Sequence, residues 1–351
     1  MTLVAILRHL AFAGGLALVS AVVVRAMINA RVMDLPNDRS SHTVPTPRGG
    51  GMGIVVAFLL GIGFLYGFAS FARLADPYFR GVIMAAIVIA VVGFIDDLRD
   101  WPFSVKLAAQ LLAALAAVGS GLFLQVFRIP VLGPVDIGWL AGAAITVGWI
   151  LFATNAMNFI DGLNGLAAGT TLVASLCLAA IAAGQGGWFV YFASVLLAAG
   201  VAGFLPFNFP RARIFMGDVG SQFCGFVLAV LGIAASRFDK VELSFLLVPM
   251  LLSGVLFDVA FTLLRRALAG ERLTQAHRGH LYQVAQRSGM DARLVAATHW
   301  GFAALGGLAC LGFMAAPGPV KPLVPLLLLI PQIAWATYVA ARARRAGLGR
   351  W

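Results

Sequence analysis

The chain has 351 residues, of which 61% are hydrophobic and 11% are charged, and its mean hydropathy is +0.95. A soluble domain carries about 25% charged residues, so this composition excludes an ordinary soluble protein and indicates that lipid surrounds most of the chain. One membrane crossing takes about 20 apolar residues, so eleven crossings would use roughly 220 and leave no room for a large domain outside the membrane. The formal net charge of +11 is interpreted first as a signal of membrane orientation.

Eleven apolar segments follow one another along the sequence and predict eleven transmembrane helices. They are Leu3–Val24, Gly51–Ala69, Gly81–Ile95, Phe103–Leu124, Ile137–Thr154, Leu166–Ala183, Trp188–Phe207, Ser221–Ala235, Leu243–Leu264, Leu294–Met314 and Leu323–Ala340. The first segment lacks a clear small-residue cleavage site, so we expect a membrane span and not a removed signal peptide. The three cysteines lie inside apolar segments, which favours small hydrophobic residues over a disulfide or zinc framework.

When successive connections are assigned to alternate sides, most of the 25 lysines and arginines fall on one side. By the positive-inside rule this side is cytoplasmic, with the N-terminus outside and the C-terminus cytoplasmic. We therefore predict an all-α polytopic membrane protein with a single domain, 1–351. Its cytoplasmic active-site loops are expected at 25–50, 96–104, 155–165, 208–220 and 265–293. The basic residues are dispersed over short loops, which argues against nucleic acid as a partner.

Acidic residues occur in three of these loops at a similar membrane depth. Asp96 and Asp97 are adjacent in GFIDDLRD, Asp161 lies in NAMNFIDGLNGLA, and Asp218 lies in RIFMGDVGS. Adjacent carboxylates repel each other unless a cation or a shared proton lies between them. Hard oxygen ligands without a Cys/His set favour Mg²⁺ or Mn²⁺ over zinc. The alternative is that the carboxylates cap helix ends and are simply hydrated.

Asn155, Asn158, Asp161 and Asn164 recur every three residues, directly before an apolar segment. On a helix this spacing places the four side chains along one face. A polar stripe at membrane depth is costly unless it binds something, so the pattern favours a binding site. Hydrogen bonding between helices is the alternative.

Two basic segments on the same side indicate binding of anionic groups. Arg48 precedes a glycine run in PRGGGMGI, where bare backbone amides and a helix N-terminus suit an anion, although such glycines also serve close helix packing. His277, Arg278 and His280 lie within AHRGHLYQ, and two imidazoles around a guanidinium suit a phosphate or diphosphate.

The remaining histidines and one acidic residue receive no place in the site. His9 and His299 are given no role, and His42 in the first inner loop is a minor candidate. Asp258 lies inside the ninth apolar segment, where an ionisable residue is a functional candidate by default. Pairing toward the basic end of that segment, or hydration near the interface, explains it equally well.

Five motifs in this order resemble those of the polyprenyl-phosphate N-acetylhexosamine-1-phosphate transferase family, the MraY/WecA superfamily. They are PRGGGMGI, GFIDDLRD, TNAMNFIDGLNGLA, FNFPRARIFMGDVGS and AHRGHLYQ, and together they extend over nearly the whole chain. MraY has three consecutive histidines where this chain has His277-Arg278-Gly279-His280. The resemblance is therefore closest to the WecA/WbpL-like enzymes that initiate O-antigen chains.

The resemblance implies transfer of N-acetylhexosamine-1-phosphate from a UDP-N-acetylhexosamine to undecaprenyl phosphate, with release of UMP, at the cytoplasmic face of the bacterial inner membrane. Two like charges about 4 Å apart repel by roughly 4 kcal/mol at an effective dielectric near 20, so the two phosphates need a cation, and Mg²⁺ or Mn²⁺ is the expected cofactor. A secondary transporter or lipid flippase is the alternative. Transporters typically bind substrate near the bilayer midplane, whereas these polar residues gather at one boundary.

The resemblance also implies roles for individual residues. Asp96 and Asp97 would form the catalytic pair, Asp218 and Asn158 would bind the metal, Asp161, Asn164, Asn208 and Phe215 would line the nucleotide pocket, and Arg48, His277, Arg278 and His280 would bind the diphosphate or the sugar.

Overall fold

The computed structural model describes residues 2–36, 44–68, 77–129, 133–237, 243–273, 275 and 277–349. Mostly helical structure, 76% of the chain, confirms the predicted all-α class. The elements in chain order are α1 (Leu3–Ala30), β1 (Met33–Asp34), β2 (Thr46–Pro47), α2 (Gly51–Phe68), α3 (Pro77–Arg99), α4 (Phe103–Gly119), β3 (Val126–Ile129), β4 (Gly133–Asp136), α5 (Gly138–Phe159), α6 (Leu166–Gln185), α7 (Trp188–Asn208), α8 (Gly217–Ala235), α9 (Leu247–Leu251), α10 (Ser253–Leu268), α11 (Leu281–Arg287), α12 (Ala292–Ala315), η2 (Gly318–Val320), α13 (Leu323–Leu327) and α14 (Leu329–Arg345).

Nine helical segments of the described chain are long and apolar enough to cross a membrane. They are α1, α2, α3 from Phe79, α5, α6, α7, α8, α12 and the run Gly318–Arg345. The protein is therefore a multi-pass membrane protein, as its composition predicted. His42 and the first residue of AHRGHLYQ lie outside the described residues.

Three of the eleven predicted spans differ from a continuous long helix, and one of them, Leu323–Ala340, divides into α13 and α14 at Leu328. In Phe103–Leu124, helix α4 has 17 residues, which makes it about 26 Å long, slightly shorter than a hydrocarbon core of about 30 Å. The segment Leu243–Leu264 forms α9 and α10, and α10 starts anew after Leu252. Helix α10 carries Asp258 and a basic last turn, so its polar residues find partners in the protein and not in lipid.

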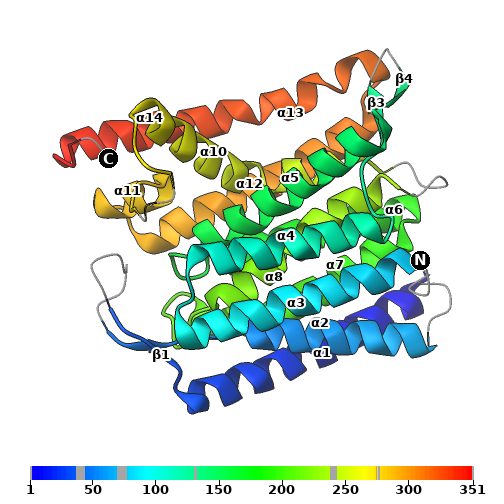
Figure 1. Cartoon of the computed structure of the whole chain (residues 1–351), viewed down its shortest axis with the longest axis horizontal. Coiled ribbons are helices and arrows are strands. Elements are labelled where there is room, and N and C mark those ends of the chain that lie inside the picture. Colours follow the sequence, from blue (N-terminus) through cyan, green and yellow to red (C-terminus); the bar gives the residue numbers. More distant parts are fainter. Residues whose placement is uncertain are drawn as a thin grey trace.

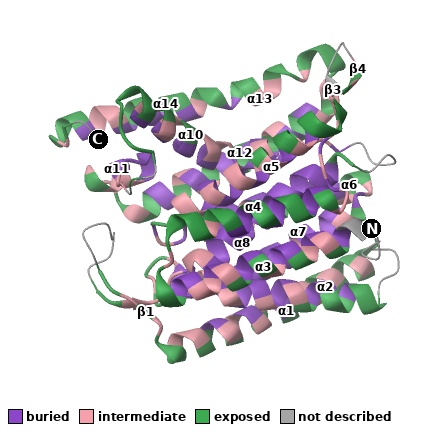
Figure 2. Ribbon diagram, viewed as in Figure 1, coloured by how far each residue is buried: buried purple, intermediate pink, exposed green. Residues whose placement is uncertain are grey.

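The helices run side by side between two ends of an elongated bundle (Figure 1). Helix α1 begins at one end and α14 finishes at the other, as an odd number of crossings requires. Helix α8 lies at the centre, where it packs against α2, α3, α5 and α7. Of its 18 most apolar consecutive residues 94% are buried, and Figure 2 shows this central layer as the most enclosed.

Glycines let the neighbours of α8 approach it closely, as is common between helices in lipid. A Cβ atom on Gly51 of α2 would overlap the backbone of Gly220, and one on Gly93 of α3 would overlap the backbone at Val219. A Cβ atom on Gly225 would contact the backbone of Thr154 in α5. The central helix is thus held against three neighbours by backbone contact.

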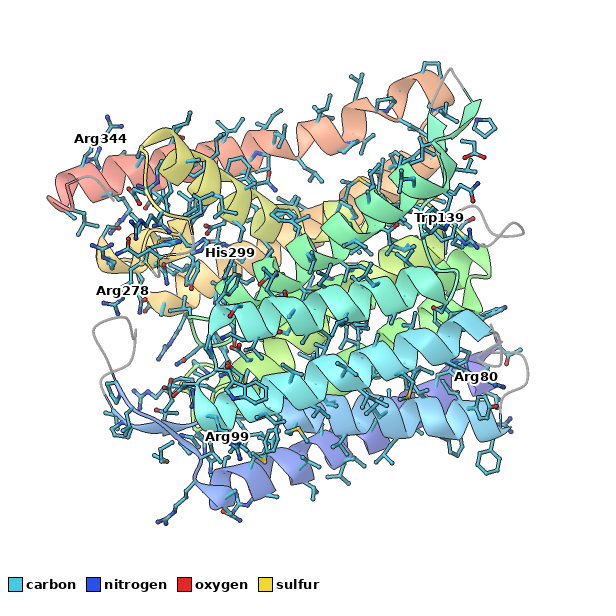
Figure 3. All side chains as sticks on the ribbon, viewed as in Figure 1. Arg80, Arg99, Trp139, Arg278, His299 and Arg344 are labelled. Atoms are coloured by element: carbon cyan, nitrogen blue, oxygen red, sulfur yellow. The ribbon has the colours of Figure 1, made fainter. Side chains whose placement is uncertain are left out.

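The two small antiparallel sheets mark opposite ends of the bundle (Figure 1). β1 pairs with β2, with Met33 opposite Pro47, and β3 pairs with β4, with Val126 opposite Asp136. Figure 3 shows Arg99, Arg278 and Arg344 at the β1 end, whereas Arg80 and Trp139 lie at the β3–β4 end. This arrangement agrees with the two sides assigned from the sequence, and which side faces the cytoplasm stays a prediction.

Candidate active site

Asp97 near the end of α3 holds the beginning of α8. Its Oδ1 accepts a hydrogen bond from the backbone N–H of Asp218 at 2.9 Å, and its Oδ2 accepts one from Val219 at 3.2 Å. The first N–H groups of a helix lack partners within the helix and favour a negative charge. Gly217 has a φ of +75°, and a Cβ atom there would overlap the Asp97 carboxylate. The close contact between Gly217 and the Asp97 carboxylate therefore fixes the position of Asp218 on the first turn of α8.

Lys106 of α4 lies between two of the predicted carboxylates. Its Nζ is 3.0 Å from Asp96 Oδ2 and 3.0 Å from Asp218 Oδ2. Asp96 Oδ1 also accepts a hydrogen bond from the backbone N–H of Trp101 at 2.8 Å. The ammonium group relieves the repulsion that two facing carboxylates would experience. Sequence reasoning counted Lys106 only as an orientation signal and missed it as a site residue.

One signal could have identified Lys106. It is the lone charged residue of α4, and Gln110 follows four residues later in FSVKLAAQLLAALAAVG. Residues four apart share a helix face. A lysine and a glutamine on one face of an apolar helix indicate that this face meets polar groups.

Asn158 contacts Asp218 from the last turns of α5. Its Nδ2 donates hydrogen bonds to Asp218 Oδ1 and to Ser221 Oγ, both at 2.9 Å. An amide nitrogen cannot bind a cation, so this contact orients Asp218, and metal binding through Asn158 Oδ1 stays a prediction. Helix α5 ends at Phe159, and therefore the expected helical stripe is wrong for its second half, where Asp161 and Asn164 lie in the turn before α6.

A cleft of about 740 Å³ brings most of the predicted site residues together. The predicted residues that line it are Arg48, Asp97, Asn158, Asp161, Asn164, Asn208, Phe215 and Asp218. Arg211, Gln283 and Gln286 line it as well, although the sequence did not single them out. His277, Arg278, His280 and Asp96 are not among the lining residues, and Lys106 connects Asp96 to the lining residue Asp218.

Asp161 is the carboxylate in this cleft with the fewest partners. It is half-buried, and within the described part of the chain no side chain donates a hydrogen bond to it. Burial raises the pKa of the Asp161 carboxyl well above its usual range, and the negative charges of Asp218 and Asp97 raise it further. Asp161 is thus the group in the cleft that would gain most from an approaching cation.

The glycine run after Arg48 pairs with the segment that precedes α8. The backbone N–H of Gly50 donates to Phe215 O at 2.9 Å, and that of Gly51 donates to Met216 O at 2.8 Å. These two amides are therefore not free for an anion, and the predicted anion-binding turn is wrong at Gly50 and Gly51. The pairing instead brings Arg48 and Phe215 to the same cleft.

Asn208 uses both ends of its side-chain amide on the backbone. Its Oδ1 accepts a hydrogen bond from the N–H of Gly165 at 2.6 Å, and its Nδ2 donates to Ile214 O at 3.0 Å. Asn164 Nδ2 lies 3.4 Å from Pro210 O across the same junction. Asn208 therefore holds together the two loops that form one wall of the cleft.

Asp258 anchors the loop of the AHRGHLYQ motif. This buried carboxylate accepts hydrogen bonds from the backbone N–H groups of Leu281 at 2.9 Å and Tyr282 at 3.0 Å, and it lies 3.1 Å from His280 Nδ1. The Tyr282 hydroxyl donates to Phe159 O at 3.0 Å, which ties the loop to the end of α5. An ionisable residue inside a membrane segment is a functional candidate, and Asp258 fits this expectation because it positions a predicted site loop.

His277 is held as a neutral imidazole. Its Nδ1 accepts a hydrogen bond from the N–H of Gly279 at 3.1 Å, which requires an unprotonated Nδ1. Burial lowers the pKa of His277 to about 4, and the nearby His280, Arg266 and Arg265 contribute to this shift. His277 can therefore act toward a substrate as a donor through Nε2, and not as a cation.

The fold and the site define a multi-pass membrane protein with an acid-lined cleft at one end of its helical bundle. The sequence profile of glycosyl transferase family 4 matches residues 79–236. The chain is 31% identical over 279 residues to a probable undecaprenyl-phosphate N-acetylglucosaminyl 1-phosphate transferase of Bacillus subtilis, which covers 79% of this chain and 76% of that protein.

Two further relatives extend this comparison. The decaprenyl-phosphate N-acetylglucosaminephosphotransferase of Mycobacterium tuberculosis is 34% identical over 271 residues, which is 70% of this chain and 67% of that protein. The phospho-N-acetylmuramoyl-pentapeptide-transferase of Desulforudis audaxviator is 36% identical over 186 residues, which is 48% of this chain and 54% of that protein. The chain therefore belongs to glycosyl transferase family 4, within the MraY/WecA superfamily that its motifs predicted.

Proposed function

We propose that this protein transfers N-acetylhexosamine-1-phosphate from a UDP-N-acetylhexosamine to undecaprenyl phosphate, releases UMP and so initiates a lipid-linked envelope polysaccharide of the O-antigen type. The proposed location is the bacterial inner membrane, with the cleft at its cytoplasmic face. The named activities of the relatives from Bacillus subtilis and Mycobacterium tuberculosis support the reaction class. The charge distribution supports the orientation.

The observation that carries this proposal is the convergence of distant segments on one cleft. Asp97, Asn158, Asp161 and Asp218 come from α3, α5, the turn after α5 and α8, and all line the same space. The cleft is lined by Asp97, two residues before Arg99, and Figure 3 shows Arg99 at one end of the bundle. This position suits a water-soluble nucleotide and a lipid phosphate, whereas a transporter typically binds its substrate near the midplane.

In the proposed reaction a phosphate oxygen of undecaprenyl phosphate attacks the β-phosphorus of the UDP-sugar. The bond between the β-phosphorus and the bridging oxygen breaks, and UMP leaves with that oxygen. Asp97 lines the cleft, whereas Asp96 does not and instead has its Oδ2 at 3.0 Å from Lys106 Nζ. We therefore assign acceptance of the lipid phosphate proton to Asp97 and the positioning of Lys106 to Asp96.

The donor set at Asp218 suits Mg²⁺, with Mn²⁺ as a substitute. Among the described residues no three His, Cys, Asp or Glu side chains form a ready cluster for a metal. Mg²⁺ commonly binds through one or two carboxylates and completes its shell with waters and substrate phosphates. Asp218 would be the main ligand, with Asp161 or the Oδ1 of Asn158 beside it. When bound, the ion neutralises the diphosphate and aligns it for in-line displacement.

The remaining cleft residues are assigned to the nucleotide sugar. Arg48, Arg211 and Phe215 line the cleft. We assign the two guanidinium groups to the diphosphate and the Phe215 ring to the uracil. Arg278, His277 and His280 directly precede α11, which lines the cleft with Gln283 and Gln286. We assign Arg278, His277 and His280 to the sugar, with His277 as a neutral donor.

The test uses the purified full chain with undecaprenyl phosphate, Mg²⁺ and a panel of UDP-N-acetylhexosamines. We expect UMP and a lipid diphosphate sugar in equal amounts, detected by mass spectrometry, for at least one member of the panel. Asp218→Asn should lower this rate at least 1000-fold, because it removes the main ligand charge, about 4 kcal/mol of barrier. Absence of UMP with every donor would overturn the proposal. Movement of the sugar across vesicles without UMP would favour the transporter.

A further inference from the structure

A line of three side-chain amides runs through the bundle and ends on Asp218. Asn155 Nδ2 donates to Gln110 Oε1 at 2.5 Å, Gln110 Nε2 donates to Gln222 Oε1 at 2.9 Å, and Gln222 Nε2 donates to Asp218 Oδ2 at 2.8 Å. The amides come from α5, α4 and α8 in turn. Gln110 and Gln222 are only 1% and 2% exposed.

The direction of this amide line follows from the charge at its end. An ionised carboxylate only accepts hydrogen bonds, so Gln222 must present its nitrogen to Asp218. The Gln222 oxygen then accepts from Gln110, and the Gln110 oxygen accepts from Asn155, whose nitrogen also donates to Leu151 O at 2.8 Å. Each amide is thus held in one orientation, and reversing any one of them would place two like groups together.

The amide line reaches Asp218 from a different side than the cleft residues do. Asp218 accepts hydrogen bonds from Lys106, Asn158 and Gln222. Asn158 lines the cleft, whereas Gln110, Asn155 and Gln222 do not. Buried amides in an apolar bundle cost free energy unless they are fully paired. If these three side chains served packing alone, apolar side chains of similar size would do so at lower cost.

We propose that Gln222, Gln110 and Asn155 are positioning residues that fix the Asp218 carboxylate from the interior, so that its remaining lone pair faces a divalent cation in the cleft. This inference rests on the proposed function for its kinetic part. None of the three amides touches the substrate. Gln222 acts directly on Asp218, and Gln110 acts through Gln222.

The first test compares Gln222→Met and Gln110→Met, which keep side-chain length and remove the hydrogen bonds. The matched control is Gln332→Met. Gln332 is equally buried and donates a hydrogen bond to Ser253 Oγ at 2.9 Å, and neither residue lines the cleft. We measure Mn²⁺ binding from the electron paramagnetic resonance signal of the free ion, and the unfolding temperature of each variant. Gln222→Met should weaken Mn²⁺ binding about 10-fold and Gln110→Met about 3-fold, with no change for Gln332→Met.

The second test measures kcat and KM of the same variants in the UMP assay. Gln222→Met should lower kcat about 10-fold with little change in the KM for the lipid, since the lipid does not touch the amides. In the Gln222→Met background, Gln110→Met should cause no further loss of kcat, because its path to Asp218 is already broken. Unchanged Mn²⁺ binding and kcat, with unfolding temperatures lowered as in Gln332→Met, would overturn the inference. An inactive wild-type protein that still shows the Mn²⁺ pattern would overturn only the proposed function.

Discussion

Lys106 lies between two carboxylates and offsets part of their mutual repulsion. We expect Lys106→Met to destabilise the fold by about 3 kcal/mol in EDTA, because Asp96 and Asp218 lose their shared cation. Added Mg²⁺ should restore part of the unfolding temperature, since a divalent ion can bind the same carboxylates. Lys321→Met is the control, because Lys321 contacts the Phe313 ring far along the sequence from any acidic residue of the site. Wild-type stability of Lys106→Met in EDTA would contradict this role.

The raised pKa of Asp161 predicts a stability that falls with rising pH. Above about pH 4 the unfolded chain releases the Asp161 proton first, while the folded protein retains it up to its higher pKa, so the folded state loses stability over this interval. Asp161→Asn removes this effect. At pH 8 the variant should unfold about 1–3 °C above the wild type, whereas the two should coincide near pH 4. A lower unfolding temperature at pH 8 would contradict the prediction.

The residues found from the sequence are those whose chemistry is unusual at membrane depth. Asp97, Asp161 and Asp218 could be placed in one site because carboxylates are rare in this chain and recur on one side. Lys106 stands out as the lone charged residue of its helix, but its partners and those of Gln222 could not be predicted, because they depend on which helices touch. The sequence also could not show that Asn208 is fully occupied by backbone groups, since that follows from how two loops meet.

The contact between α2 and α8 predicts a sharp difference between two glycines of the same helix. Gly51→Ala would force a Cβ atom into the backbone at Gly220, and neither backbone can move without displacing the first turn of α8 that carries Asp218. We expect a loss of about 3 kcal/mol or more in stability, together with loss of UMP formation. Gly63→Ala should change neither, because a Cβ atom there meets nothing within 4 Å. Equal behaviour of the two variants, in thermal unfolding and in the assay, would contradict this packing.

The existence of the helices is well predicted from the sequence, because a long apolar segment in lipid must pair every backbone polar group and a helix does so within the segment. Their ends are less well predicted. Helix α5 stops at Phe159, so the three-residue spacing of polar side chains continues into a turn. The break between α9 and α10 at Leu252 is likewise hidden, because the leucines around it are as apolar as those within a continuous span.

At the scale of the whole molecule, one buried helix connects the cleft with the centre of the bundle. Helix α8 begins at the cleft with Asp218 and is enclosed by α2, α3, α5 and α7 (Figure 2). Asp97 of α3, Asn158 of α5 and the glycine run before α2 all meet its first turns. The first four of the five motifs therefore all meet at the N-terminus of α8. This explains how residues more than a hundred positions apart form one site.

The orientation in the membrane is predicted from the charge distribution and is tested on the whole protein in cells. Single cysteines are introduced as Arg99→Cys and Arg344→Cys at one end, and as Arg80→Cys and Trp139→Cys at the other (Figure 3). All four positions are exposed, and the chain with its native Cys177, Cys224 and Cys310 gives the background. By the positive-inside rule, a membrane-impermeant maleimide should label Arg80→Cys and Trp139→Cys in intact spheroplasts, and the other two only after permeabilisation. The reverse pattern would place the cleft outside, where UDP-sugars are not supplied, and labelling of all four from one side would contradict the crossing of the membrane by this bundle.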